Sequence, residues 1–177
     1  MEQSHFTISK TLLLIFRILF TFFVLWTIWF IFHNSLEEGA ISAARSEQIT
    51  RIVNHVLEKV HREPVSEFTV RKLAHFSEFM LLGFAYTLCL RVYTRRYIRY
   101  VSWPLLLGLL VANIDETIQA YVEGRASSVR DVWIDFGGCC VGVVVSLCIM
   151  LLIGALFVLA GFGRPHLHPP EEGRRVR

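Results

Sequence analysis

The chain has 177 residues, of which 54% are hydrophobic and 19% are charged, with a formal net charge of +3 and a mean hydropathy of +0.49. Soluble domains hold about 45–50% apolar and roughly 25% charged residues, so this composition excludes a soluble multidomain enzyme. It also excludes a disordered chain, which needs low hydrophobicity. The length fits one domain, and what remains is a small integral membrane protein.

Four apolar segments predict transmembrane helices, because a spanning helix needs about 20 mainly apolar residues. The segments cover about 11–32, 73–90, 101–120 and 137–161. The third has an uncharged part only from Val101 to Ile114, so it spans a membrane only if the polar residues after it also lie at membrane depth. The predicted fold class is an all-α integral membrane protein with four transmembrane helices.

The connection between the first two segments predicts a further helix. Apolar residues recur there at the i, i+3, i+4, i+7 and i+11 spacing of one helix face, and the pattern ends before Pro64; they are Ile49, Ile52, Val53, Val56 and Val60. We expect an amphipathic helix of about four turns, on the outer membrane surface or capping the bundle. The alternative is a partly ordered connector.

The arginines predict the topology. Four lie between the second and third segments, at positions 91, 95, 96 and 99, and four more in the tail at 164, 174, 175 and 177. The positive-inside rule places both regions in the cytoplasm, so both termini are expected to be cytoplasmic. We expect residues 1–163 to form the membrane domain and 164–177 a disordered cytoplasmic tail. No aromatic-basic motif accompanies the arginines, so no nucleic-acid partner is expected.

Polar residues gather at the predicted outer ends of three helices. Arg71, His75 and Glu78 fall within about 60° of one another on a helical wheel. The other members lie at the end of the third segment and in the stretch that leads into the fourth: Asp115, Glu116, Gln119, Arg125, Asp131 and Asp135. Gly138 and Gly142 continue the face of Asp135 and would allow a neighbouring helix to approach closely.

Depth distinguishes these residues from surface charges. At ~1.5 Å per residue, Glu78 stands ~18 Å above Leu90 and Asp115 ~21 Å above Val101, inside a hydrocarbon layer about 30 Å thick. Charges at such depth are functional candidates by default. Buried ion pairs that lock helices together are the alternative, but they would explain two or three such residues and not nine. Arg130 and Glu123 are interpreted as solvated loop charges, and Lys72 as a snorkelling side chain.

The residue types suit chemistry on a phosphate group. Arg71 and Arg125 offer forked donors for phosphate, while His75 can shuttle a proton with Glu78 as its base or orienting partner. The side chains of Asp115, Glu116, Asp131 and Asp135 could hold a hard divalent cation through oxygen ligands. No particular cofactor is predicted.

Three motifs in order resemble the VanZ-like family of bacterial membrane proteins. They are R-K-L-A-H-F-S-E-F-M-L-L-G at 71–83, D-E-T-I-Q-A-Y-V-E-G-R at 115–125 and D-V-W-I-D-F-G-G at 131–138. The first predicted helix, ending in Phe32-His33-Asn34-Ser35, is also similar to the family. Phe79 and Asp135 stand where the family frequently has tyrosine and asparagine.

The resemblance implies a multi-pass protein of the bacterial plasma membrane, associated with teicoplanin resistance, whose motif residues act on lipid head groups. The resulting hypothesis is a hydrolase or transferase that modifies a phosphate-bearing lipid or a lipid-linked envelope precursor at the outer leaflet. The expected catalytic residues are His75, Glu78, Asp115, Glu116 and Asp131, and the expected substrate-binding residues are Arg71, Gln119, Arg125 and Asp135.

Three alternatives stay open at this point. The chain would be a non-catalytic amphiphile-binding protein, a small proton-coupled transporter, or an assembly subunit whose polar cluster is structural. The sequence does not predict the oligomeric state, and a dimer through the face of Gly138 and Gly142 is one alternative.

Overall fold

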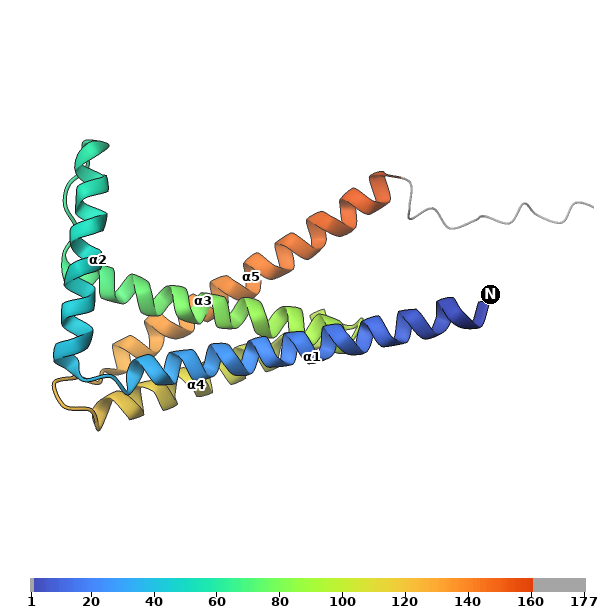
Figure 1. The fold of residues 1–177 in the computed structure, drawn as a ribbon, viewed down its shortest axis with the longest axis horizontal. Coiled ribbons are helices and arrows are strands. Elements are labelled where there is room, and N and C mark those ends of the chain that lie inside the picture. The colour runs from blue at the N-terminus through green and yellow to red at the C-terminus, as the bar shows by residue number, and fades with distance from the viewer. Residues whose placement is uncertain (1, 161–177) are drawn as a thin grey trace, which may run out of the picture. The chain divides into compact units, whose positions relative to one another are not determined.

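A computed structural model describes the backbone of residues 2–160 and the side chains from Lys10 to Ala160 (Figure 1). Within this range the chain is helical and contains no strand. The elements are α1 (Glu2–Ser35), α2 (Gly39–Lys59), α3 (Glu67–Tyr93), η1 (Tyr97–Tyr100), α4 (Ser102–Ala120) and α5 (Val129–Leu159). The chain divides into two compact units, one reaching to Ser146 and one starting at Leu147. All packing described below belongs to the first unit.

The four predicted membrane helices are confirmed. Four helical segments are long and apolar enough to cross a membrane: Lys10–Ser35, Glu67–Tyr93, Tyr97–Ala120 and Val129–Leu159. Large apolar side chains such as Leu19, Phe22 and Leu110 are exposed on these helices. Such an outer surface is suited to contact with lipid chains, because a soluble protein rarely exposes large contiguous apolar patches.

The second and fourth membrane helices begin earlier than their apolar segments. Ser66 caps α3, because its Oγ accepts a hydrogen bond from the Thr69 N–H at 3.2 Å. Ser128 precedes α5, and its Oγ accepts from the Arg130 N–H at 3.1 Å. Hydropathy missed these first turns because they are polar. The predicted tail, 164–177, lies outside the described residues.

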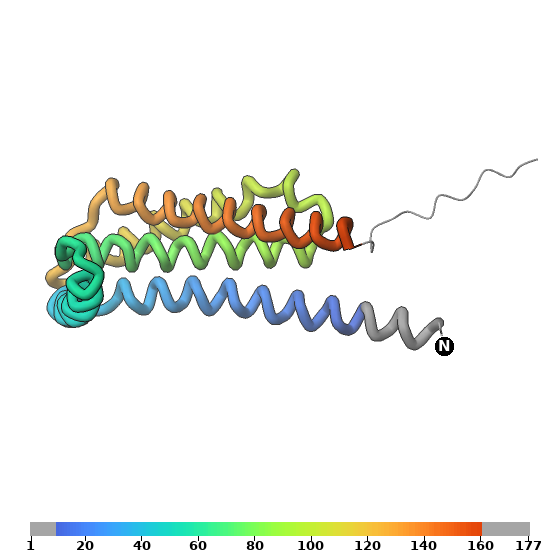
Figure 2. The backbone as a smooth tube through the Cα atoms, turned by 90° about the horizontal axis from the view of Figure 1, so that it is seen from above, coloured from blue at the N-terminus to red at the C-terminus, as the bar shows by residue number. Residues whose placement is uncertain are grey.

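The predicted amphipathic helix is confirmed and is longer than the apolar pattern. It occupies 39–59 and lies steeply across the end of α1 (Figure 1), and it is seen nearly along its axis in Figure 2. The helix ends at Lys59; His61, two residues further on, is left-handed (φ 53°), and the Arg62 N–H donates to the Leu57 carbonyl at 2.9 Å. The Asn54 side chain then accepts from the Val65 N–H and donates to the Val65 carbonyl. The exposed isoleucines and valines of α2 form an apolar face that is not packed against the rest of the protein.

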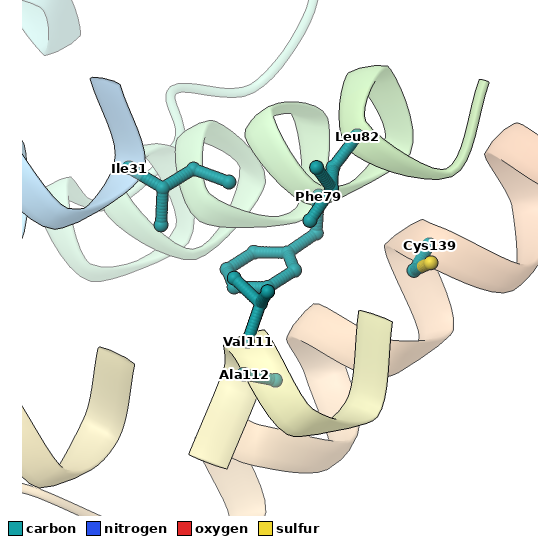
Figure 3. Close-up of a cluster of buried hydrophobic side chains, with 6 residues drawn as sticks. All are labelled: Ile31, Phe79, Leu82, Val111, Ala112 and Cys139. Atoms are coloured by element: carbon teal, nitrogen blue, oxygen red, sulfur yellow. The ribbon is translucent and has the colours of Figure 1, made fainter. Parts of the chain in front are cut away.

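The hydrophobic core lies where α1, α3, α4 and α5 meet. Its members are shown in Figure 3: Ile31, Phe79, Leu82, Val111, Ala112 and Cys139. Glycines allow α5 to lie backbone-to-backbone on α3, because a Cβ at Gly138 or Gly142 would overlap the carbonyl oxygen of Phe76 or Met80. The glycine face is therefore occupied by α3 of the same chain and is not free to form a dimer.

Candidate functional site

A polar cavity lies where α1 and α4 end and where α3 and α5 begin. Water-sized molecules can occupy about 130 Å³ of it. Seven of the nine predicted site residues line the cavity, together with other residues of α2, α3 and the α4–α5 loop. The lining residues are Gly39, Ser42, Arg71, Lys72, His75, Glu116, Gln119, Gly124, Arg125, Ala126, Asp131 and Asp135. The remaining two predicted residues, Glu78 and Asp115, are bonded into the same network.

Asp115 is completely buried and joins α4 to the last residue of α1. Its Oδ1 accepts a hydrogen bond from Ser35 Oγ at 2.5 Å, and its Oδ2 accepts from Gln119 Nε2 at 2.9 Å. Gln119 Nε2 also lies 3.3 Å from Ser35 Oγ. These donors offset part of the cost of burying a carboxylate.

Glu78 is bonded to α1 rather than to His75. Its Oε1 accepts from Asn34 Nδ2 at 2.9 Å, and its buried Oε2 has no hydrogen-bond partner among the described residues. The nearest acidic oxygen to His75 Nδ1 is Asp115 Oδ2, at 4.0 Å. This separation exceeds a hydrogen bond, so the expected partnership of His75 with Glu78 is replaced by an approach of His75 to Asp115.

Arg125 holds the end of α1 in place. Its Nε donates to the Glu37 carbonyl at 3.0 Å and its Nη2 to the Asn34 carbonyl at 2.6 Å. The guanidinium therefore binds one carbonyl in the last turn of α1 and one in the turn that follows it. Burial lowers the pKa of Arg125 below its ordinary value, against the opposing effect of the Asp115 and Glu37 carboxylates. Because two of its N–H groups bind these backbone carbonyls, part of the hydrogen-bonding capacity of Arg125 is used for structure.

Arg71 and Lys72 are adjacent in sequence but differ in their contacts. Lys72 Nζ lies 2.5 Å from Asp131 Oδ2, and the two side chains are 20% and 15% exposed. The interpretation of Lys72 as a snorkelling side chain is wrong, because it ties α3 to the first turn of α5. Arg71 lines the cavity and has no hydrogen bond or ion pair within the described part of the chain.

The remaining carboxylates come from α4 and α5. Glu116 Oε2 accepts from the Ser128 N–H at 2.9 Å, which joins the end of α4 to the start of α5. Asp135 is 1% exposed, and its Oδ2 has no hydrogen-bond partner among the described residues. One potential ligand atom from each of His75, Asp115 and Asp135 lies within 4.8 Å of the others.

Sequence reasoning did not single out Asn34, Ser35 or the ends of the loops as site residues. Gly39 donates its N–H to the Glu123 carbonyl at 3.0 Å, and Gly124 (φ +73°) approaches Gly39 so closely that a Cβ on Gly39 would overlap it. The available signal for Asn34 and Ser35 was their place, directly after His33, at the polar end of a long apolar segment.

The fold and the site define a multi-pass membrane protein with a polar cavity built from the ends of its helices. A model of the VanZ/LLP1 family matches residues 17–153, which includes every residue of the site, and the chain belongs to that family. Searches of curated proteins and of solved structures gave no match. Phe79, at the position where tyrosine is frequent, is fully buried in the apolar core.

Proposed function

We propose that this protein modifies a phosphate-bearing lipid, or a lipid-linked envelope precursor, at the outer leaflet of the plasma membrane. One observation carries the proposal: Arg71 faces the cavity without a hydrogen bond or ion pair in the described part of the chain, beside His75 and several buried carboxylates. A planar guanidinium with free donors matches the oxygens of a phosphate group.

The cavity is lined by cationic side chains suited to a phosphate head group. Arg71, Lys72 and Arg125 all line it, and a volume of about 130 Å³ accommodates a phosphate but not the acyl chains of a lipid. The chains would therefore stay among the exposed apolar side chains of the membrane helices. This arrangement supports recognition of the head group at the end of a membrane helix.

The cavity also contains groups for proton transfer. His75 Nδ1 lies 4.0 Å from Asp115 Oδ2, and Glu116 lines the same cavity. An imidazole close to a carboxylate suits general acid–base catalysis, which a hydrolase and a transferase of phosphate esters both need. The cationic side chains would hold the phosphate while His75 and the neighbouring carboxylates activate the attacking group.

Comparative lipidomics of cell envelopes tests the proposal. Three strains are compared: one with the wild-type gene, one with the gene deleted, and one with His75→Ala at the same level of protein. We expect a phosphate-bearing lipid or precursor to change in amount on deletion and His75→Ala to reproduce that change. If the deletion leaves every lipid unchanged, the proposal is contradicted. Teicoplanin susceptibility, measured in the same strains, is expected to follow the altered precursor.

A small proton-coupled transporter is the second candidate. It is favoured by Glu78 Oε2 and Asp135 Oδ2, two buried carboxylate oxygens without hydrogen-bond partners in the described range, because such groups form proton relays in membrane proteins. Glu78→Gln separates the two candidates. In a transporter it abolishes proton-driven uptake, whereas an enzyme that works through His75 and Asp115 keeps its turnover, because Glu78 does not line the cavity.

A further inference from the structure

We propose that His75, Asp115 and Asp135 bind one divalent first-row transition-metal ion, Zn²⁺ or Mn²⁺, at the wall of the cavity. The three residues come from α3, α4 and α5, so the ion would join three membrane helices. One imidazole nitrogen with two carboxylate oxygens is a mixed donor set that suits these ions. The role of the ion in catalysis rests on the proposed function, whereas its binding does not.

The geometry is close to that of a coordination sphere. The three ligand atoms lie within 4.8 Å of one another, and His75 Nδ1 is 4.0 Å from Asp115 Oδ2. Two ligands that each lie ~2.0–2.2 Å from an ion are at most ~4.4 Å apart. Small side-chain shifts would therefore complete the site. A gap of 4.0 Å is too long for a hydrogen bond, but it can accommodate an ion between the two atoms.

Unsatisfied buried atoms point to a missing ligand. Asp135 is 1% exposed, yet its Oδ2 has no hydrogen-bond partner within the described range, and neither has His75 Nδ1. A buried carboxylate without partners carries a large desolvation cost. A metal ion would satisfy both atoms at once, because it accepts a lone pair from each.

The charge balance of the site points the same way. The five acidic residues of the predicted site are accompanied by three cations that line the cavity, Arg71, Lys72 and Arg125, while the nearby Arg45 is paired with Glu37. When all are ionised, two negative charges remain, and these match one divalent cation. The competing arrangement is protonation of two buried carboxyl groups, which would leave no ion bound.

The site keeps an open side, as a catalytic metal centre does. His75 and Asp135 line the cavity, so water or a phosphate oxygen can reach an ion bound between them. Arg71 lines the same cavity and could contact the same phosphate group. With an ion bound, His75 would act as a ligand, and proton transfer would pass to a neighbouring carboxylate such as Glu116.

Metal content of the purified full-length protein tests the proposal directly. The protein carries no histidine tag and has His166→Gln and His168→Gln, so that tail imidazoles do not bind metal. It is stripped with chelator, exposed separately to Zn²⁺, Mn²⁺ and Mg²⁺, desalted and analysed by elemental mass spectrometry. We expect about one Zn²⁺ or Mn²⁺ per chain and less Mg²⁺. His75→Ala and Asp135→Ala should each weaken binding by about 100-fold or more, since even the partners of metal ligands change affinity 10–100-fold.

The matched control is the double substitution His55→Ala with Glu58→Ala. It removes an exposed imidazole and carboxylate three residues apart on α2, a pair able to bind metal adventitiously, and it should leave the stoichiometry unchanged. Helix content and size-exclusion profiles show that each variant is folded. The visible spectrum of Co²⁺ bound in place of the native ion is a second measurement, for use if one variant misfolds. We expect this spectrum to differ between wild type and Asp135→Ala.

Two results would overturn the metal site: no ion retained at micromolar metal, or equal retention by wild type and both ligand variants. These results are separable from failure of the proposed function. If a lipid changes in a His75-dependent way but the protein binds no metal, the proposed enzyme is supported and the metal site is contradicted. If one ion binds per chain but the lipid profile is unchanged, the metal site is supported and the proposed enzyme is contradicted.

Discussion

Ser35 shows how a single hydroxyl stabilises the site. It is fully buried and donates to Asp115, a carboxylate that is itself removed from solvent. Because Asp115 accepts only from Ser35 and Gln119 within the described residues, the loss of either donor leaves a buried charge with too few hydrogen bonds.

Ser35→Ala is therefore expected to lower the free energy of unfolding by about 1–3 kcal/mol, measured by denaturation in detergent. The matched control is Ser146→Ala, because Ser146 is equally buried and its Oγ has no hydrogen-bond partner in the described structure. That substitution should be neutral or stabilising. Equal losses at the two positions would contradict the role given to Ser35.

The Lys72–Asp131 ion pair should show strong coupling in a double-mutant cycle. Lys72→Gln and Asp131→Asn should each destabilise the protein, but their combined effect should be smaller than the sum, because either single change strands a mostly buried charge. The Arg51–Glu47 pair is the control, since its side chains are 70% and 60% exposed, and exposed pairs contribute at most about 1 kcal/mol. Additive effects at Lys72 and Asp131 would contradict the pairing.

The sequence predicted which ends of the membrane helices carry the site residues, but not how these residues pair. Arg71, His75 and Glu78 follow from helical spacing and depth. Glu78 binding to Asn34, and Lys72 binding to Asp131, depend on how each helix is rotated against its neighbours, which the pattern of a single helix does not contain.

At the scale of elements, the contact between α3 and α5 sets the position of Asp135. Gly138 begins the close approach three residues after Asp135, and Gly142 continues it one turn later. The sequence predicted this seam from the small residues, but not that α3 was the helix that fills it. The starts of α3 and α5 were placed too late because apolar content does not detect a serine cap.

Gly142→Ala should disrupt that approach. Its new methyl group would overlap the Met80 carbonyl oxygen, a backbone atom that cannot rotate away, so we expect a loss of about 1–3 kcal/mol or more together with lower activity. Gly154→Ala is the control, because a Cβ there meets no described atom within 4 Å. Thermal unfolding in detergent distinguishes them, and similar melting temperatures for the two variants would contradict close packing at Gly142.

At the scale of the whole molecule, a site can form in this short chain because several of its helices begin or end with polar residues at the same place. Residues far apart in sequence, such as Asn34 and Arg125, meet because α1 and α4 end at the same level. The all-helical fold and the number of spans followed from hydropathy. The role of Arg125 at the end of α1 did not, because its hydrogen-bond acceptors are backbone carbonyls, which every residue has.

The direction of insertion is a prediction from the arginines alone. Reporter fusions at both termini should be cytoplasmic, and a reporter inserted near Glu58 on α2 should lie outside. Replacing the four arginines between α3 and α4 with glutamine should weaken this preference, whereas replacing Arg51 and Arg62 should not. A reporter near Glu58 that faces the cytoplasm would place the cavity at the inner leaflet and contradict the proposed substrate location.

The central claim is that the cavity binds the phosphate of a lipid, and Arg71 tests it more cleanly than Arg125, whose loss would also release the end of α1. Native mass spectrometry would measure the phosphate-bearing lipid that stays bound to purified wild type, Arg71→Gln and the control Arg51→Gln. We expect retention in wild type and Arg51→Gln, and a loss of about tenfold or more in Arg71→Gln, as removal of a charge-assisted contact implies. Equal retention by all three folded proteins would contradict the claim.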